Sequence, residues 1–276
     1  MRKNFVWCVV LSAVLAACDR KKAVSEVDYA DDSVIDSLFD SPDSLIFSSG
    51  SSDEELPKRA DELFDDFIFE FARLKKVQLE RVEFPLLSIV RGDTAWLTEK
   101  QWKYESLFMN QDYYTVFYND EEQMELEKRT DLNRVDVEQR LVKTCRFQRL
   151  KGEWRLTQES IRDFTTAEPL DKFMDFYRRF VSDAAFQQRS VSNPLRYVTT
   201  DPDDDFNTIE GTLDHDQWDA FKPQLPDGVI THIRYGQTYD NPDGMILVKA
   251  GISNGLMDIL DFRKKDGEWK LVSYEN

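Results

Sequence analysis

The chain repeats its own sequence pattern, and this repetition limits the fold more than any other feature does. Matching residues occur in collinear blocks at offsets of 109, 115 and 116 positions. The blocks pair Phe64, Asp66, Phe67 and Phe71 with Phe173, Asp175, Phe176 and Phe180; Gln78, Val82, Pro85 and Leu86 with Gln187, Val191, Pro194 and Leu195; Leu97, Gln101 and Trp102 with Leu213, Gln217 and Trp218; and Phe147, Gly152, Glu153, Trp154 and Leu156 with Phe262, Gly267, Glu268, Trp269 and Leu271. We therefore predict two homologous domains, at residues 57–162 and 166–276.

Each predicted domain opens with helices and closes with strands. Apolar residues recur at helical spacing from Phe64 to Leu74 and again from Phe173 to Phe180. Pro85 and Pro194 then end the helical regions, and short helices are expected at 97–102 and 213–218. Residues 113–118 are aromatic and β-branched, and residues 256–262 alternate, which is typical of strands; Asn254-Gly255 and Asp266-Gly267 favour tight hairpins. Helices before strands predict an α+β fold with an antiparallel meander.

This arrangement resembles the cone fold of the nuclear transport factor 2-like superfamily, in which N-terminal helices pack on a bent antiparallel sheet. The Gly-Glu-Trp-(Arg/Lys)-Leu hairpins at 152–156 and 267–271 look like the last sheet turn of secreted members. The resemblance implies two tandem cone domains. Superfamily dimers pack sheet against sheet, so a pseudo-dimer of this kind within one chain is one possibility, and it would bury residues 113–118.

The N-terminus has the pattern of a secretory signal at residues 1–17. A basic Met1-Arg2-Lys3 start precedes an apolar run from Phe5 to Ala17, which is shorter than the roughly 20 residues that span a bilayer. The end, Leu15-Ala16-Ala17-Cys18, looks like the lipobox of bacterial lipoproteins, which implies acylation of Cys18 with chains such as palmitate. The alternative is an ordinary signal peptide in which Cys18 is incidental.

Residues 18–56 have the composition of a tether. They are rich in Ser and Asp, and their apolar residues lack a sustained period, although residues 34–46 have the pattern of a short helix that docks on the folded part. With the lipobox, the tether makes the chain similar to lipoproteins of Gram-negative gut anaerobes whose domain has no assigned function. We expect a location in the cell envelope, at the outer membrane, with the periplasmic and surface faces both left open.

Composition excludes several classes of function. The chain has 36 Lys and Arg against 53 Asp and Glu, a net charge of −17, which argues against nucleic-acid binding and against adsorption to anionic lipid. Three Cys residues rule out a disulfide scaffold, and Cys145 is expected in a core strand. The two His residues argue against a His-rich metal site, so no metal and no cofactor are predicted.

The candidate site residues are aromatic. Trp102, Tyr104, Trp218 and Tyr235 are the residues expected to line a pocket, and the alternative is that both Trp side chains fill the core. The cluster Asp214-His215-Asp216 has two interpretations, a proton-transfer site or the start of a short helix, and His232 is interpreted as structural. The acidic stretches 201–205 and 240–244 hint at Ca²⁺ but lack EF-hand spacing, which favours solvated loops.

The sequence therefore favours a non-catalytic lipoprotein that binds a small apolar ligand or acts as a scaffold for an envelope protein. No catalytic residue can be assigned. Enzymes of the superfamily use an Asp or His inside the cone, so the alternative is an isomerase- or dehydratase-like enzyme with an acid/base site in one cone. A third hypothesis is an inhibitor or partner of secreted enzymes that uses its acidic surface.

Overall fold

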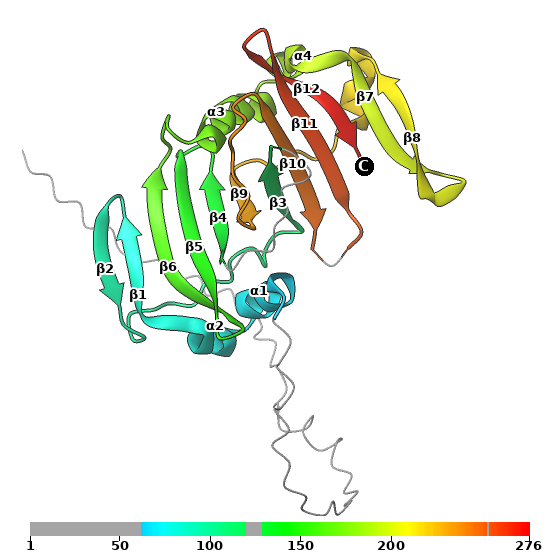
Figure 1. Ribbon diagram of the computed structural model, residues 1–276. Helices are drawn as coiled ribbons and strands as arrows, with labels where there is room; N and C mark the ends of the chain where they lie inside the picture. Colours follow the sequence, from blue (N-terminus) through cyan, green and yellow to red (C-terminus); the bar gives the residue numbers. More distant parts are fainter. Residues whose placement is uncertain (1–61, 120–128, 253) are drawn as a thin grey trace, which may run out of the picture. The chain divides into compact units, whose positions relative to one another are not determined.

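The computed structural model describes residues 62–119, 129–252 and 254–276, except for the side chains of residues 205 and 206, and these residues belong to one compact unit (Figure 1). The predicted signal peptide, Cys18 and the tether lie outside the described residues. The described part contains five helices and twelve strands. In chain order these are α1 (Phe64–Arg73), α2 (Lys75–Arg81), β1 (Val82–Val90), β2 (Asp93–Leu97), β3 (Tyr113–Tyr118), β4 (Arg129–Asp136), β5 (Leu141–Leu150), β6 (Glu153–Asp163), α3 (Pro169–Ser182), α4 (Ala184–Ser190), β7 (Val191–Asp201), β8 (Asp204–Leu213), α5 (His215–Phe221), β9 (Val229–Arg234), β10 (Gly244–Gly251), β11 (Met257–Lys265) and β12 (Glu268–Glu275).

The helix–helix–strand succession occurs twice, so we call α1 to β6 the first half and α3 to β12 the second half. Helices α1 and α3 bury the apolar stripes that their spacing predicted. Asp65 and Asp66 lie in the first turn of α1 and Arg73 in its last, which suits the helix dipole, and Pro169 opens α3, where a missing N–H costs nothing. None of the helices in the described part is both long and apolar enough to cross a membrane.

The twelve strands form one sheet, in the order β2-β1-β6-β5-β4-β9-β3-β10-β11-β12-β7-β8. The prediction of an antiparallel meander was wrong for three neighbouring pairs. β1 runs parallel to β6, β7 runs parallel to β12, and β3 runs parallel to β9. The sheet is therefore mixed. The first strand of each half pairs with the next strand on one side and with the last strand of the same half on the other side.

The two halves exchange a strand at the centre of this sheet. β3 belongs to the first half but pairs antiparallel with β10 of the second, from Ile246↔Tyr118 to Gly251↔Tyr113. β9 belongs to the second half but pairs antiparallel with β4 of the first, from Asp131↔Arg234 to Asp136↔Val229. Figure 1 shows β9 between β4 and β3, so each half supplies the strand that completes the other.

The possibility that the halves stack sheet against sheet is not what the structure has. The halves join edge to edge, and β3 and β9 meet at a single register pair, Thr115↔His232. The Thr115 hydroxyl donates to the Thr231 carbonyl at 2.9 Å and reinforces this junction. Burial of β3 therefore comes from its central position in one continuous sheet.

The hydrophobic cores follow the exchange. One core cluster surrounds α1 and includes Ile233 of β9, together with Phe147 and Trp154 of the first half. The other surrounds α3 and includes Phe117 of β3, together with Phe262 and Leu271 of the second half. The core around α3 also contains Val135, Val137 and Val142 of the first half, so each core includes buried residues from the other half's chain segment.

The turns agree only in part with the sequence. Asp266 and Gly267 both have positive φ, 53° and 81°, as a tight hairpin requires, and Lys151 and Gly152 repeat this. The predicted helix at 213–218 exists as α5, but the one at 97–102 does not. Its first residues close one turn, in which the Gln101 side chain accepts from Thr98 N, and the chain then leaves toward Tyr104, which bonds to α1.

Candidate functional site

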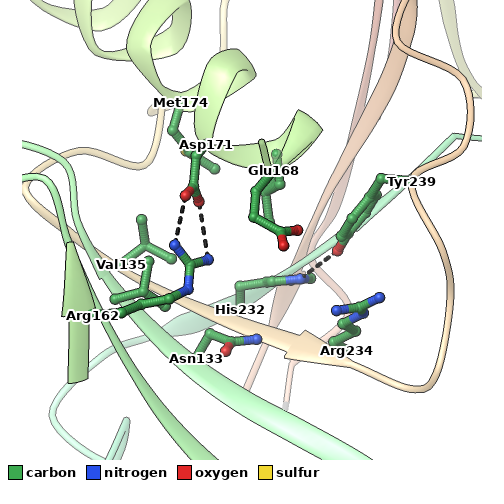
Figure 2. Close-up of a pocket in the computed structure, with 11 residues that line it drawn as sticks. Asn133, Val135, Arg162, Glu168, Asp171, Met174, His232, Arg234 and Tyr239 are labelled. Carbon is green, nitrogen blue, oxygen red and sulfur yellow. Dashed lines mark hydrogen bonds and ion pairs between the residues drawn. The ribbon is translucent and has the colours of Figure 1, made fainter. Parts of the chain in front are cut away.

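A small polar cavity lies between the amino-terminal end of α3 and the strands β4, β5 and β9. Figure 2 shows its polar groups: Asn133, Arg162, Glu168, Asp171, His232, Arg234 and Tyr239. Asn133 and Arg162 come from the first half, and the others come from the second half or the segment leading into it. The cavity is thus located where the two halves meet.

His232 and Tyr239 form a buried hydrogen-bonded pair at one side of the cavity. His232 Nε2 lies 2.8 Å from the Tyr239 hydroxyl, and His232 Nδ1 lies 3.4 Å from the Thr115 carbonyl oxygen. A carbonyl only accepts, so Nδ1 carries the proton and Nε2 accepts from Tyr239. Burial lowers the pKa of His232 to about 3, helped by Arg234, and burial raises the pKa of Tyr239. Both side chains are neutral near pH 7.

Arg162 and Asp171 form an ion pair at the other side. The Arg162 guanidinium donates to both Asp171 oxygens, at 2.5 and 3.1 Å, and Thr165 N donates to the same carboxylate at 2.8 Å. Asp171 is 2% exposed, so its charge is compensated by these three donors. The pair fastens the start of α3 to β6, which is the last strand of the first half.

The dimensions of the cavity limit its chemistry. Its volume is about 40 Å³, enough for one or a few water molecules and far below the roughly 300 Å³ at which organic ligand pockets begin. The Nε2 lone pair of His232 is occupied, and its pKa is too low for a general base near neutral pH. The arrangement can order water and hold the two halves together, but it cannot enclose a metabolite.

Aromatic rings fill the space between helix and sheet in both halves. Around α1, Phe64, Phe71, Phe147 and Trp154 meet edge to face at centroid distances of 5.1 to 5.6 Å. Around α3, the rings in contact at 5.2 to 5.9 Å are Phe173, Tyr177, Phe180, Phe262 and Trp269. Such edge-to-face packing resembles a protein interior and leaves little room for a ligand.

Buried and partly buried charges outside the cavity are also paired. Lys249 and Asp258 lie 3.1 Å apart with both side chains 5% exposed, and the Tyr274 hydroxyl donates to the other Asp258 oxygen at 3.0 Å. In the first half, Lys143 pairs with Glu105, whose backbone N–H and carbonyl bond the Gln78 side chain. A carboxylate whose oxygens are already bonded to a cation and other donors has little capacity left to accept a hydrogen bond from a substrate.

The four predicted pocket residues lie apart. Trp218 is 2% exposed and donates to Gln187, whereas Trp102 is partly buried against Phe84. Tyr104 donates to the Ala72 carbonyl, and Tyr235 donates to Asp65 at 2.6 Å. None of the four lines the cavity of Figure 2. Their assignment to a ligand pocket stays a prediction.

The remaining sequence candidates have local structural roles in the described residues. Asp214 immediately precedes α5, and its N–H bonds Gln217, which favours the helix-start interpretation; His215 Nε2 lies 2.9 Å from the Val191 carbonyl. Cys145 is buried, and burial raises its pKa to about 12, so it stays a thiol. In the described part, no cluster of three or more His, Cys, Asp or Glu side chains is arranged to hold a metal ion.

Most residues of the cavity could not be predicted from the sequence. Arg162 and Asp171 flank the segment between the halves, and Tyr239 lies in a loop after β9, so no local spacing connects them. Among the cavity residues, the sequence analysis assigns a role only to His232, a structural one, and the complete burial of this side chain agrees with that interpretation. The signal that could have pointed to Arg162 and Asp171 is the presence of opposite charges on either side of the predicted domain junction.

Comparisons with known proteins agree with the fold. A family model described as a domain of unknown function, DUF4348, matches residues 45–276. The crystal structure of an NTF2-like protein from Bacteroides fragilis NCTC 9343 is similar at 40% sequence identity with a TM-score of 0.73, covering 80% of this chain and 98% of that chain. No curated protein matches. The predicted resemblance to nuclear transport factor 2-like proteins and to a family of unassigned function is confirmed.

Proposed function

Because the chain belongs to the DUF4348 family and has the nuclear transport factor 2-like α+β fold, we propose that it is a non-catalytic interaction protein of the cell envelope. It consists of two tandem domains that join edge to edge in one sheet as an internal pseudo-dimer, and a lipid on Cys18 holds it at the outer membrane. The single observation that carries the non-catalytic role is the filled interior of both halves.

The tandem arrangement is supported by sequence and by topology together. Three of the four matching blocks fall in corresponding elements, for example Phe67 in α1 and Phe176 in α3, or Trp154 in β6 and Trp269 in β12. The sheet order is also the same when read inward from either edge, with β2-β1-β6-β5-β4 matching β8-β7-β12-β11-β10. Duplication of one ancestral unit accounts for both facts.

The filled interior is tested with an uncharged apolar fluorescent probe such as N-phenyl-1-naphthylamine. An interior without a ligand-sized cavity should bind less than one probe per chain, with a dissociation constant weaker than about 100 µM. One-to-one binding near 1 µM, lost on replacing a buried core Phe, would mean that a cone opens to apolar ligands.

The alternative, an isomerase- or dehydratase-like enzyme, has the His232–Tyr239 pair as its best support. Both residues are buried titratable groups that line the cavity. Turnover of a hydrophobic carbonyl compound by the purified protein, abolished by Tyr239→Phe, would establish the enzyme and overturn the proposal.

Anchoring is tested separately, because it depends on Cys18 alone. Cys18→Ser removes the site of acylation, so no acyl chain holds the protein at the membrane. The variant should therefore move from the membrane fraction to the soluble fraction. A matched Cys145→Ser variant removes the other thiol of the mature chain and should stay at the membrane. If Cys18→Ser still partitions into detergent, the lipobox interpretation is wrong.

A further inference from the structure

A groove of about 430 Å³ opens where α3, α4 and the β11–β12 hairpin meet. Phe176, Phe186 and Trp269 form its aromatic walls, and Arg179, Arg189 and Lys270 lie around them. Among the described residues that line the groove, Glu268 is the only acidic one. In a chain with 53 acidic and 36 basic residues, this is a local reversal of charge.

Arg189 is the cation in this groove that is available for a ligand. Arg179 stacks over the Phe186 ring at 4.1 Å and lies 3.6 Å from Asp183, and Lys270 lies 3.3 Å from Glu268. The Arg189 guanidinium lies over the same Phe186 ring at 5.4 Å and donates to the Ala185 carbonyl. No carboxylate of the described residues lies within 4.0 Å of it.

In the first half, the surface that corresponds to this groove is covered by a residue of the chain itself. Trp154 stands where the second half has Trp269, and residue Glu62, in the extended chain before α1, lies across it. Glu62 N donates to the Gly152 carbonyl at 3.3 Å, and the Trp154 indole N–H donates to the Glu62 carbonyl at 3.0 Å. The Glu62 carboxylate bonds Arg81 at 2.9 and 3.1 Å. Trp154 is consequently only 1% exposed.

The second half lacks this cover because its first helix begins a turn earlier. Phe173 matches Phe64, but α3 starts at Pro169, so the residue that matches Glu62 is Asp171, which points to Arg162 instead. Trp269 and Phe176 are therefore only partly buried. The Trp269 indole N–H has no hydrogen-bond partner among the described residues.

We propose that this groove binds an extended acidic segment of a partner protein, in the way that Glu62 covers Trp154. A carboxylate of the segment pairs with Arg189, and a main-chain carbonyl accepts from the Trp269 indole N–H. Charge-assisted hydrogen bonds of this kind, next to aromatic rings, give both affinity and direction. The inference rests on the proposed function as an interaction protein and adds the chemistry of the partner.

The probe is a fluorescent peptide with the sequence of residues 60–66, its ends blocked, and the control peptide has Asn or Gln at its four acidic positions. The protein is the mature chain from residue 18 with Cys18→Ser. Anisotropy should show saturable binding, about tenfold stronger for the acidic peptide than for its neutral control. Arg189→Ala should weaken binding at least about fivefold and Trp269→Phe about threefold, whereas Lys100→Ala, an exposed cation of the first half, should change it less than about twofold.

A second measurement locates the peptide. In a nitrogen–proton correlation spectrum, the indole signal that disappears in Trp269→Phe should be the one that shifts most on adding the peptide. No saturable binding up to about 1 mM, equal binding of the neutral peptide, or full binding by a folded Arg189→Ala variant would overturn the inference. Those outcomes concern this groove alone; the dye, turnover and fractionation experiments decide the proposed function independently.

Discussion

His232 is kept neutral by its burial at the junction of the halves, and this lowers the free energy of unfolding at acidic pH. Its pKa in the folded chain is lowered from 6.5 to about 3, with burial the largest cause. Between these values the unfolded chain binds a proton that the folded chain does not, so the free energy of unfolding falls as the pH falls. Above 6.5 neither state is protonated, and the residue contributes no pH dependence.

We therefore expect His232 to destabilise the protein by about 2 kcal/mol on going from pH 7.5 to pH 5. Denaturant titrations at both pH values measure this loss, and His232→Gln, which keeps a side-chain acceptor for Tyr239, should lose correspondingly less than the wild type. The carboxylates titrate alike in both proteins, so the difference isolates the imidazole. Equal losses in the two proteins would contradict the assignment.

Asp171 illustrates a second residue-scale effect, a buried carboxylate with three donors. Asp171→Asn should lower the free energy of unfolding by about 1–3 kcal/mol, less than for a fully buried pair because the Arg162 side chain is 41% exposed. The control is Asp163→Asn, whose pair with Arg91 is 61% exposed on both sides and should cost under about 0.5 kcal/mol. Equal effects of the two variants would show that the Asp171 pair has no special role.

At the scale of elements, the sequence pattern predicted the helices, strands and turns whose formation depends on residues close together in the chain. α1 and β3 occur where helical spacing and aromatic, β-branched composition placed them, and Asp266-Gly267 forms the expected hairpin turn. The parallel partners β1 and β6 could not be predicted, because an alternating strand does not encode which neighbour it receives. The cavity could not be predicted either, because its polar groups come from strands and loops that are distant in sequence.

The β11–β12 hairpin turn offers a test of backbone conformation without side-chain clashes. A Cβ at Gly267 or at Gly211 meets no atom within 4 Å, but Gly267 has φ +81° whereas Gly211 lies in β8 without a positive φ. We expect Gly267→Ala to cost about 1–2 kcal/mol in the free energy of unfolding and Gly211→Ala to be neutral or stabilising by up to about 1 kcal/mol. Thermal melts of both variants check this, and a harmless Gly267→Ala would rule out the strained turn.

At the scale of the molecule, the exchange of β3 and β9 makes the halves depend on each other. The sequence repetition predicted two units but not this exchange, because β3 and β9 are both six-residue strands with a buried centre, and this pattern does not encode which neighbour a strand pairs with. The exchange gives each core a side chain from the other half, Phe117 around α3 and Ile233 around α1.

This arrangement predicts crossed effects of core mutations. Phe117→Ala, in a first-half strand, should lower amide-exchange protection in α3 more than in α1, and Ile233→Ala should do the reverse. Each substitution should cost about 2–5 kcal/mol of stability, because both side chains are at most 1% exposed. Hydrogen exchange read by mass spectrometry resolves the two helices. Losses confined to the mutated residue's own half would contradict the exchange.

The exchange also has a consequence for biosynthesis. The first half emerges from the ribosome before β9 and β10 have been synthesised. At that stage the edge of β4 that pairs with β9 is unpaired, and β3 lacks its partner β10. Open strand edges invite association with other nascent chains. We therefore expect the nascent chain to need chaperone protection until β9 and β10 have been synthesised, and a product truncated after the first half to associate with other chains through the unpaired edge of β4.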